Sequence, residues 1–193
     1  MSNIFQNLEM EAFRAGVTPR TKQSIDWFRR KAQAMRRVNR ESLVKEKAIE
    51  QQSNGIVGNM YMFSYDAKHK DTLPYYDMFP LVVVVGPADE GFYGLNLHYL
   101  PPLLRAKMLD GLMGITNNRK YDASTKIQAS YSMLKRASTL KYFKPCFKHY
   151  LNSQVRSKFA YVPPPEWEIA TFLPTANFTK GKNVVYKDSR KMI

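Results

Sequence analysis

The spacing of apolar residues changes along the chain, and its first part predicts an amphipathic helical arm over residues 1–57. Thr18 and Pro19 form a helix-start signal, since Thr is a good N-cap and Pro is tolerated in the first helical turn. The apolar stripe that follows recurs at helical spacing and contains Ile25, Trp27, Phe28, Ala32, Met35 and Val38. Such a wide apolar face must be buried, either on its own domain or on a partner.

Residues 58–100 instead hold short apolar runs separated by turns, which is typical of β-structure. Strands are expected at residues 60–65, 79–85 and 92–99, with a hairpin turn at 89–91. Short strands with close turns predict a small antiparallel sheet or an SH3-like β-barrel.

Helical spacing returns after residue 101, so several helices are expected to pack against the sheet. The predicted helices cover residues 103–113, 126–137 and 142–159, and the tail from residue 179 is expected to cross back as a strand. The fold class is therefore α+β, with the arm at 1–57 and one domain at 58–193. Within that domain, 58–100 is the β-rich core, 101–162 is helical and 163–193 is a C-terminal return segment.

One carboxylate stands out in the stretch LPYYDMFPLVVVV at residues 73–85. Asp77 lies there between two tyrosines and a run that is expected to be buried. Each flanking proline favours extended backbone in the residue before it. An Asp in such a turn is well placed to accept backbone N–H bonds, so a structural cap is favoured over a catalytic acid.

The charge of the chain is strongly positive, with a formal net charge of +14. Residues 123–165 contain no Asp or Glu, while basic and aromatic residues alternate there. Cations neutralise phosphates and rings stack on bases, so a nucleic-acid surface is one interpretation. The candidate residues are Arg29, Arg36, Arg37, Lys141, Lys144, Lys148, Arg156 and Lys158. A protein-binding surface and a merely solvated basic face remain the alternatives.

Catalytic chemistry is weakly represented, and no enzyme, metal or cofactor is expected. Asp66, His69, Asp71 and His98 occur without the spacing of a metal site. Cys146 and His149 would share a helical face, but a buried thiol is the favoured interpretation of this single cysteine. No phosphate-cradling glycine loop, signal peptide or bilayer-spanning run is found in the sequence, and a reducing compartment is expected.

Three stretches of the chain carry a resemblance to a known group of proteins. They read KDTLPYYDMFPLVVVV, GFYGLNLHYLPPLLR and FKPCFKHYLNSQVRSKF. Over residues 13–193 the chain resembles virion-associated proteins of T-even-like contractile-tailed phages. The resemblance implies a non-enzymatic component of the virion, of the tail or baseplate, made in the host cytoplasm.

Two functional hypotheses remain open at this point, with a metal-dependent nuclease as a weaker third. In the first, neighbouring virion subunits bind the arm through Ile25, Trp27, Phe28 and Met35, and bind an exposed rim formed by Tyr75, Tyr76 and His98. In the second, the chain binds nucleic acid, acting on the ends of phage DNA or on packaged DNA. Neither hypothesis involves a membrane.

Overall fold

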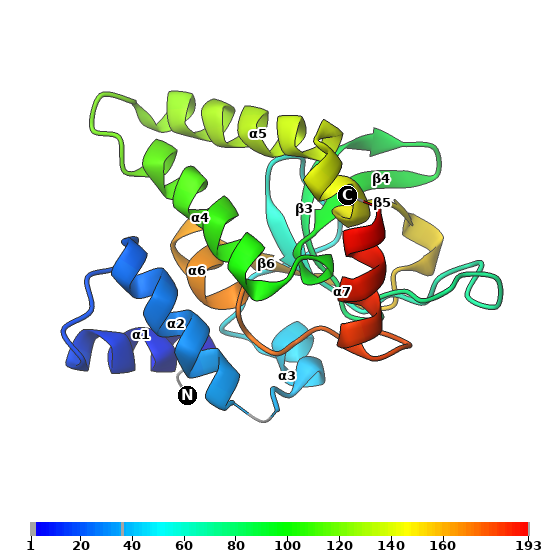
Figure 1. Ribbon diagram of the computed structural model, residues 1–193, viewed down its shortest axis with the longest axis horizontal. Helices are drawn as coiled ribbons and strands as arrows, with labels where there is room; N and C mark the ends of the chain where they lie inside the picture. The colour runs from blue at the N-terminus through cyan, green and yellow to red at the C-terminus, as the bar shows by residue number, and fades with distance from the viewer. Residues whose placement is uncertain (1–2, 36, 193) are drawn as a thin grey trace.

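The computed structural model describes residues 3–35 and 37–192. It contains a six-stranded antiparallel sheet with helices packed against it (Figure 1). The strands are β1 (Gln51–Gln52), β2 (Met60–Met62), β3 (Leu81–Ala88), β4 (Gly91–Asn96), β5 (Phe147–Leu151) and β6 (Phe159–Val162). The helices are α1 (Ile4–Arg14), α2 (Lys22–Ala34), α3 (Arg40–Lys45), α4 (Pro102–Thr116), α5 (Ala123–Thr139), α6 (Trp167–Ala170) and α7 (Lys182–Lys191). The predicted α+β class is confirmed.

The sheet is open, with the strand order β1-β6-β2-β3-β4-β5. The hairpin between β3 and β4 turns at Glu90, which has a positive φ of 57°, so the predicted turn at 89–91 is confirmed. A register shift between Val84 and Gly86 marks a bulge that bends β3. Because β1 and β5 are unpaired edges, the structure has the predicted sheet and not the alternative closed barrel.

The sheet is nevertheless strongly curved around a cluster of aromatic side chains. Phe92 on β4 and Phe159 on β6 are separated by β2 and β3, which in a flat sheet corresponds to about 14 Å. Their ring centroids are only 5.8 Å apart, and Phe63 contacts both rings. The concave face is therefore filled by interlocking rings from opposite sides of the sheet.

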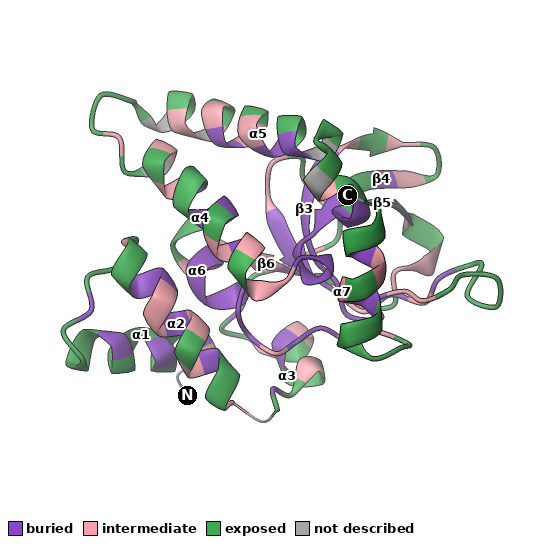
Figure 2. Cartoon of the chain, in the orientation of Figure 1, coloured by how far each residue is buried: buried purple, intermediate pink, exposed green. Residues whose placement is uncertain are grey.

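Helices cover the other face of the sheet. Alternate strand residues such as Met60, Leu81 and Val83 point into a second core that is shared with α2, α4, α5 and α7. Figure 2 shows buried residues on the central strands and on stretches of the helices around them. The short 3₁₀ helix η1 (Leu97–Tyr99) leads from β4 toward α4 and is itself buried.

The N-terminal helices pack on the same chain. Helix α2 begins after the N-cap Thr21 and not after Thr18, because Thr21 and Ser24 form a reciprocal capping box. Helix α2 then contacts α4 and α6, and its residues Ile25 and Phe28 are only 2% and 4% exposed. The apolar stripe of the predicted arm is thus largely covered within the protein.

Several predicted elements differ from the structure. The arm that is expected to be helical contains strand β1, and the strand expected at residues 92–99 ends at Asn96, where η1 follows. Residues 142–159 do not form a helix: Pro145 lies in the 3₁₀ helix η2 (Lys141–Cys146), and β5 then pairs with β4. The apolar residues of this segment fit either period, and strand pairing decided between them. The predicted strand in the tail is helix α7, where Val185 and Ser189 lie four residues apart on one buried face.

Asp77 is the centre of a buried hydrogen-bond network. Its Oδ1 accepts the backbone N–H of Phe79 (3.1 Å) and of Asn177 (2.9 Å). Its Oδ2 accepts the side-chain amide of Asn96 (3.2 Å) and Nδ1 of His98 (2.6 Å). The bond to Phe79 confirms the predicted turn-capping role. The other three bonds join this turn to η1, to the end of β4 and to the C-terminal segment.

The pKa values of the pair follow from these contacts. Burial alone would raise the pKa of Asp77, but His98 and the hydrogen bonds from Asn177 and Asn96 outweigh it and lower the pKa. Burial lowers the pKa of His98 more strongly than Asp77 raises it. Neutral His98 therefore donates from Nδ1 to Asp77 and accepts at Nε2 from the hydroxyl of Thr175, 3.1 Å away.

Arg105 on α4 is a second buried polar centre. Its guanidinium donates to the carbonyl oxygens of His98, Leu100 and Thr171 and to the hydroxyl of Tyr186. These bonds tie η1, the segment after α6, and α7 to one helix. The charge is satisfied by carbonyl and hydroxyl oxygens, without a carboxylate in direct contact.

A glycine at the start of β4 provides a test of the tight strand pairing. A Cβ added at Gly91 would overlap the carbonyl oxygen of Tyr150 on β5, so backbone atoms would have to move. We expect Gly91→Ala to lower the free energy of unfolding by about 2 kcal/mol, the scale of overpacking a close-packed site. In contrast, a Cβ added at Gly114, an exposed position of α4, meets no atom within 4 Å, so Gly114→Ala should stabilise the protein by about 1 kcal/mol. Urea denaturation of both variants measures the two changes in the free energy of unfolding. Equal changes would contradict the close approach of β4 and β5 at Gly91.

The Asp77 network predicts a pH dependence of stability. Both pKa values lie below their ordinary values of 3.8 and 6.5, so the unfolded chain takes up protons first as the pH falls. Stability should therefore decline below about pH 6.5 through His98 and decline further below about pH 4 through Asp77.

Asp77→Asn, which leaves buried donors unpaired, should lower the free energy of unfolding by roughly 3 kcal/mol at pH 7. This difference from the native protein should shrink as the pH falls from 4 to 2. Thermal unfolding of both proteins across this range measures it, and a constant difference would contradict ionisation of Asp77.

Candidate nucleic-acid interface

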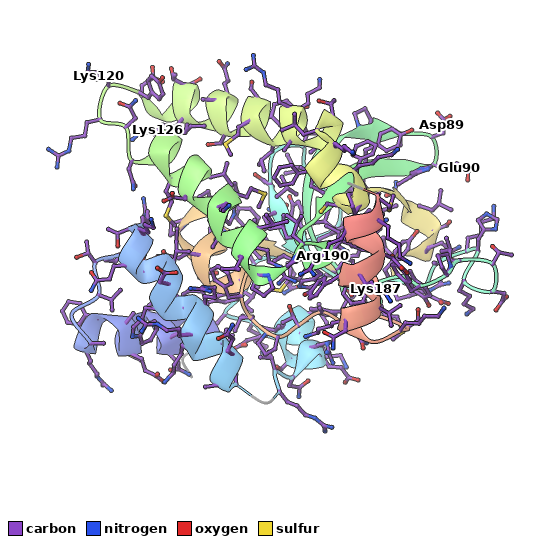
Figure 3. All side chains as sticks on the ribbon, in the orientation of Figure 1. Asp89, Glu90, Lys120, Lys126, Lys187 and Arg190 are labelled. Carbon is purple, nitrogen blue, oxygen red and sulfur yellow. The ribbon has the colours of Figure 1, made fainter. Side chains whose placement is uncertain are left out.

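Basic side chains from three parts of the chain gather around α7. We call Lys107, Lys148, Lys182, Lys187 and Arg190 the basic face; they come from α4, β5 and α7. Among the described residues, no carboxylate lies within 4.0 Å of their charged nitrogens. Figure 3 shows Lys187 and Arg190 on α7, while Lys120 and Lys126 lie on the other side of the molecule, near the turn between α4 and α5.

A cationic pocket of about 370 Å³ lies between α2, α4 and the start of α7. Arg29, Arg105 and Lys182 line it, and none of the described residues in its lining is acidic. Arg29 is paired with Asp26 at 2.9 Å through Nη2, but its Nε is buried without a hydrogen-bond partner. Surrounding protein lowers the pKa of Lys182, and the nearby Arg105 and Arg40 lower it further. The pocket thus concentrates positive charge that the described side chains do not fully neutralise.

A second pocket, of about 360 Å³, opens between η1, α4 and α7. Lys107 and Arg190 line this pocket together with apolar residues, and Tyr99 forms one of its walls. The same Tyr99 lines a third pocket of about 410 Å³ beside the edge strand β5. In that pocket the ammonium of Lys148 lies 4.2 Å from the centroid of the Tyr99 ring. Burial lowers the pKa of Lys148.

Acidic residues gather instead where α1 meets the segment that carries α6. Burial raises the pKa of Glu166 to about 7, with Glu9 adding to the rise. Burial also raises the pKa of Glu168, although Ser24 and the backbone of Arg20 donate to it. Helix α1 and helix α7 lie on different sides of the molecule in Figure 1. The charge is therefore distributed unevenly, and the face around α7 is the favourable one for a polyanion.

The structure separates the basic residues proposed from the sequence. Lys148 lies on the basic face, and Arg29 lines the cationic pocket beside Lys182. Lys141 and Lys144 are exposed on η2, and Arg156 lies 3.8 Å from Asp66. Lys158 and Arg37 are exposed in loops, and Arg36 lies outside the described residues. The acid-free span 123–165 forms no single face, because β5 and β6 are separated by three other strands.

The residues proposed for subunit binding are also dispersed. His98 is completely buried, so it does not lie on an exposed rim as expected, because Asp77 and Thr175 bind both of its ring nitrogens. Ile25 and Phe28 are buried in the protein's own core, while Trp27 and Met35 pack partly against it. Tyr75 and Tyr76 are partly exposed and both line the pocket beside β5.

The remaining chemical candidates are placed as follows. Cys146 is fully buried, and burial raises the pKa of its thiol to about 12, as an inert thiol requires. His149 is exposed on β5, and its Nε2 lies 2.9 Å from the carbonyl oxygen of Asp89. Within residues 3–35 and 37–192, three or more metal-ligating side chains do not come together. None of the helices in these ranges combines the length and apolarity needed to cross a bilayer.

Sequence reasoning missed most of the basic face. Lys107 and Arg190 are far apart in the sequence and meet only because α4 and α7 pack on η1. The available signal was the basic C-terminal tail, whose cations follow one another at helical spacing. That signal was lost because the tail was assigned to a strand.

Comparison with known proteins gives one informative result. No curated protein and no solved structure matches the chain. One protein family matches residues 3–191, which is nearly the whole sequence. The match supports a protein of a T4-like phage, but it does not support the tail or baseplate assignment and favours the DNA-binding alternative. The chain belongs to the family described as the phage T4 terminal DNA protecting protein.

Proposed function

We propose that this protein binds the ends of linear phage DNA and shields them from attack, acting as a binding protein and not as an enzyme. The observation that carries the proposal is the nearly full-length match to a family named for protection of terminal DNA. The formal net charge of +14 agrees with a polyanionic partner. In this proposal the protein travels with the packaged DNA of the virion.

The basic face is the proposed contact surface. Its cations lack described carboxylate partners, so neutralising them with phosphates requires no internal ion pair to break. The cationic pocket at the start of α7 adds Arg29 and Arg105, which lie next to Lys182 of the basic face. Contacts to phosphates supply affinity that depends steeply on salt and is insensitive to sequence. We infer no contact with other virion proteins from these features.

The direct test of the function is protection of DNA ends. We expect the purified protein to slow digestion of a linear duplex by an exonuclease that starts at ends. It should not slow an endonuclease that cuts the same sequence in a closed circle, because only the linear molecule offers ends. Digestion time courses on both substrates measure the difference. Equal protection of both substrates, or of neither, would refute the proposal.

Charge reversal tests the contact surface. Lys187→Glu with Arg190→Glu should weaken binding to linear DNA at least tenfold in moderate salt, because two phosphate contacts become repulsive. The slope of log affinity against log salt concentration should fall in magnitude by about 2. Fluorescence anisotropy across a salt series measures both quantities.

The matched control is Lys120→Glu with Lys126→Glu on the other side of the molecule (Figure 3). This pair makes the same change in net charge, so a purely global electrostatic effect would weaken binding equally in both double variants. Equal weakening would show that the basic face has no special role. Retained binding in the control variant, together with loss in the α7 variant, localises the DNA.

A further inference from the structure

The pocket beside the edge strand β5 has features beyond its positive charge. It has a volume of about 410 Å³ and lies between the loop before Asp77, η1 and β5. Among the described residues, five tyrosines line it, and we call it the tyrosine pocket: Tyr65, Tyr75, Tyr76, Tyr99 and Tyr150. This volume falls in the range that holds one small molecule, so it suits a single nucleotide and is too small for a double helix.

Tyr75 offers a ring face to a flat ligand, and it lies next to Tyr99, which is only 4% exposed and is covered by Lys148 and Phe178. The rings of Tyr75 and Tyr99 have centroids 6.2 Å apart and are tilted by 34°. Phe178 packs edge-on against Tyr99, with the two ring centroids 5.0 Å apart. Tyr75 remains partly exposed toward the pocket. Bases of any sequence stack on such side chains, because every base has a π face.

Basic side chains surround the same space. The ammonium of Lys148 lies inside the pocket over Tyr99, and no described carboxylate is within 4.0 Å of it. Lys68 and His69 are exposed at the mouth, on the loop that projects at the right of Figure 1. Of the two acids that line the pocket, Asp77 is saturated by four hydrogen bonds and Glu90 lies at the tip of the hairpin. The pocket therefore offers a stacking surface next to unneutralised positive charge.

We propose that the tyrosine pocket takes the terminal nucleotide of a DNA strand, with its base against Tyr75 and its phosphate at Lys148. This inference rests on the proposed function and explains how an end is distinguished from the interior of a duplex. A nucleotide inside a duplex must leave two stacking neighbours and its pair to enter a pocket. A terminal nucleotide also leaves its pair but has only one stacking neighbour, so its entry costs less.

The experiment places the fluorescent base 2-aminopurine either at the end or in the middle of a linear duplex. With the native protein, the fluorescence of the terminal probe should change on binding, since the base moves from the DNA stack onto tyrosine. The internal probe should not change. The ratio of affinities for open and hairpin-closed ends should also exceed tenfold, the scale of one base stacked on an aromatic ring.

Substitutions in the pocket should abolish both effects. Tyr75→Ala and Lys148→Gln should reduce the affinity ratio about tenfold and remove the change at the terminal probe. Leu73→Asp is the second test, because Leu73 lines the pocket but is 42% exposed, so it carries little of the fold. Tyr121→Ala and Lys126→Gln make matching changes outside the pocket and should leave both signals intact.

The outcomes separate this inference from the function on which it rests. A native protein that binds open and closed ends equally would refute end binding itself. A native protein that prefers open ends, with folded pocket variants that keep the preference and the probe signal, would overturn only the pocket assignment. Free deoxyadenosine monophosphate that binds as tightly as the duplex end would also overturn it, because the ligand would then be a free nucleotide.

Discussion

The carboxylate of Asp77 is the constraint on which the arrangement of the other elements depends. A buried carboxylate is stable only when its lone pairs are filled, and here four donors from three segments fill them. The donors outside this turn, on Asn96, His98 and Asn177, fix the positions of their segments relative to the turn at residues 73–80. Tyr75 is two residues before Asp77, and Tyr99 directly follows His98. The network therefore fixes both walls of the tyrosine pocket, which links a core interaction to the proposed DNA contact.

Arg105 performs a related task for the basic face. Its guanidinium bonds to carbonyl oxygens and to Tyr186, so it holds α7 against η1 without using a carboxylate. An Arg–Asp pair at this place would join the same elements but would cancel the charge. Holding a buried cation with neutral oxygens leaves the positive field intact beside Lys182, whose pKa responds to it. In this protein, stability and surface potential are thus set by the same side chain.

Much of the fold was predictable where the local pattern and the tertiary contacts agree. The β3–β4 hairpin, α4, α5 and the cap role of Asp77 follow from turn residues and hydrophobic spacing. Residues 142–159 and the tail were assigned wrongly because their apolar residues fit two periods, and only pairing with β4 or packing on η1 distinguishes them. The candidate site was harder, since Lys107, Lys148 and Arg190 come from three distant segments. The sequence contains the charge of these residues but not their proximity.

Affinity for DNA and selectivity for its ends require different physical features. Cations on α7 attract every phosphate along a duplex equally, so a basic face alone binds interior and end alike. Selectivity must come from something that only an end presents, and an end presents a base pair stacked on one side. A rigid pocket for one nucleotide, anchored by Asp77 and lined by Tyr75, Tyr99 and Lys148, meets that requirement. In the proposed complex, the basic face therefore supplies most of the binding energy, and the tyrosine pocket provides the selectivity for the end of the DNA.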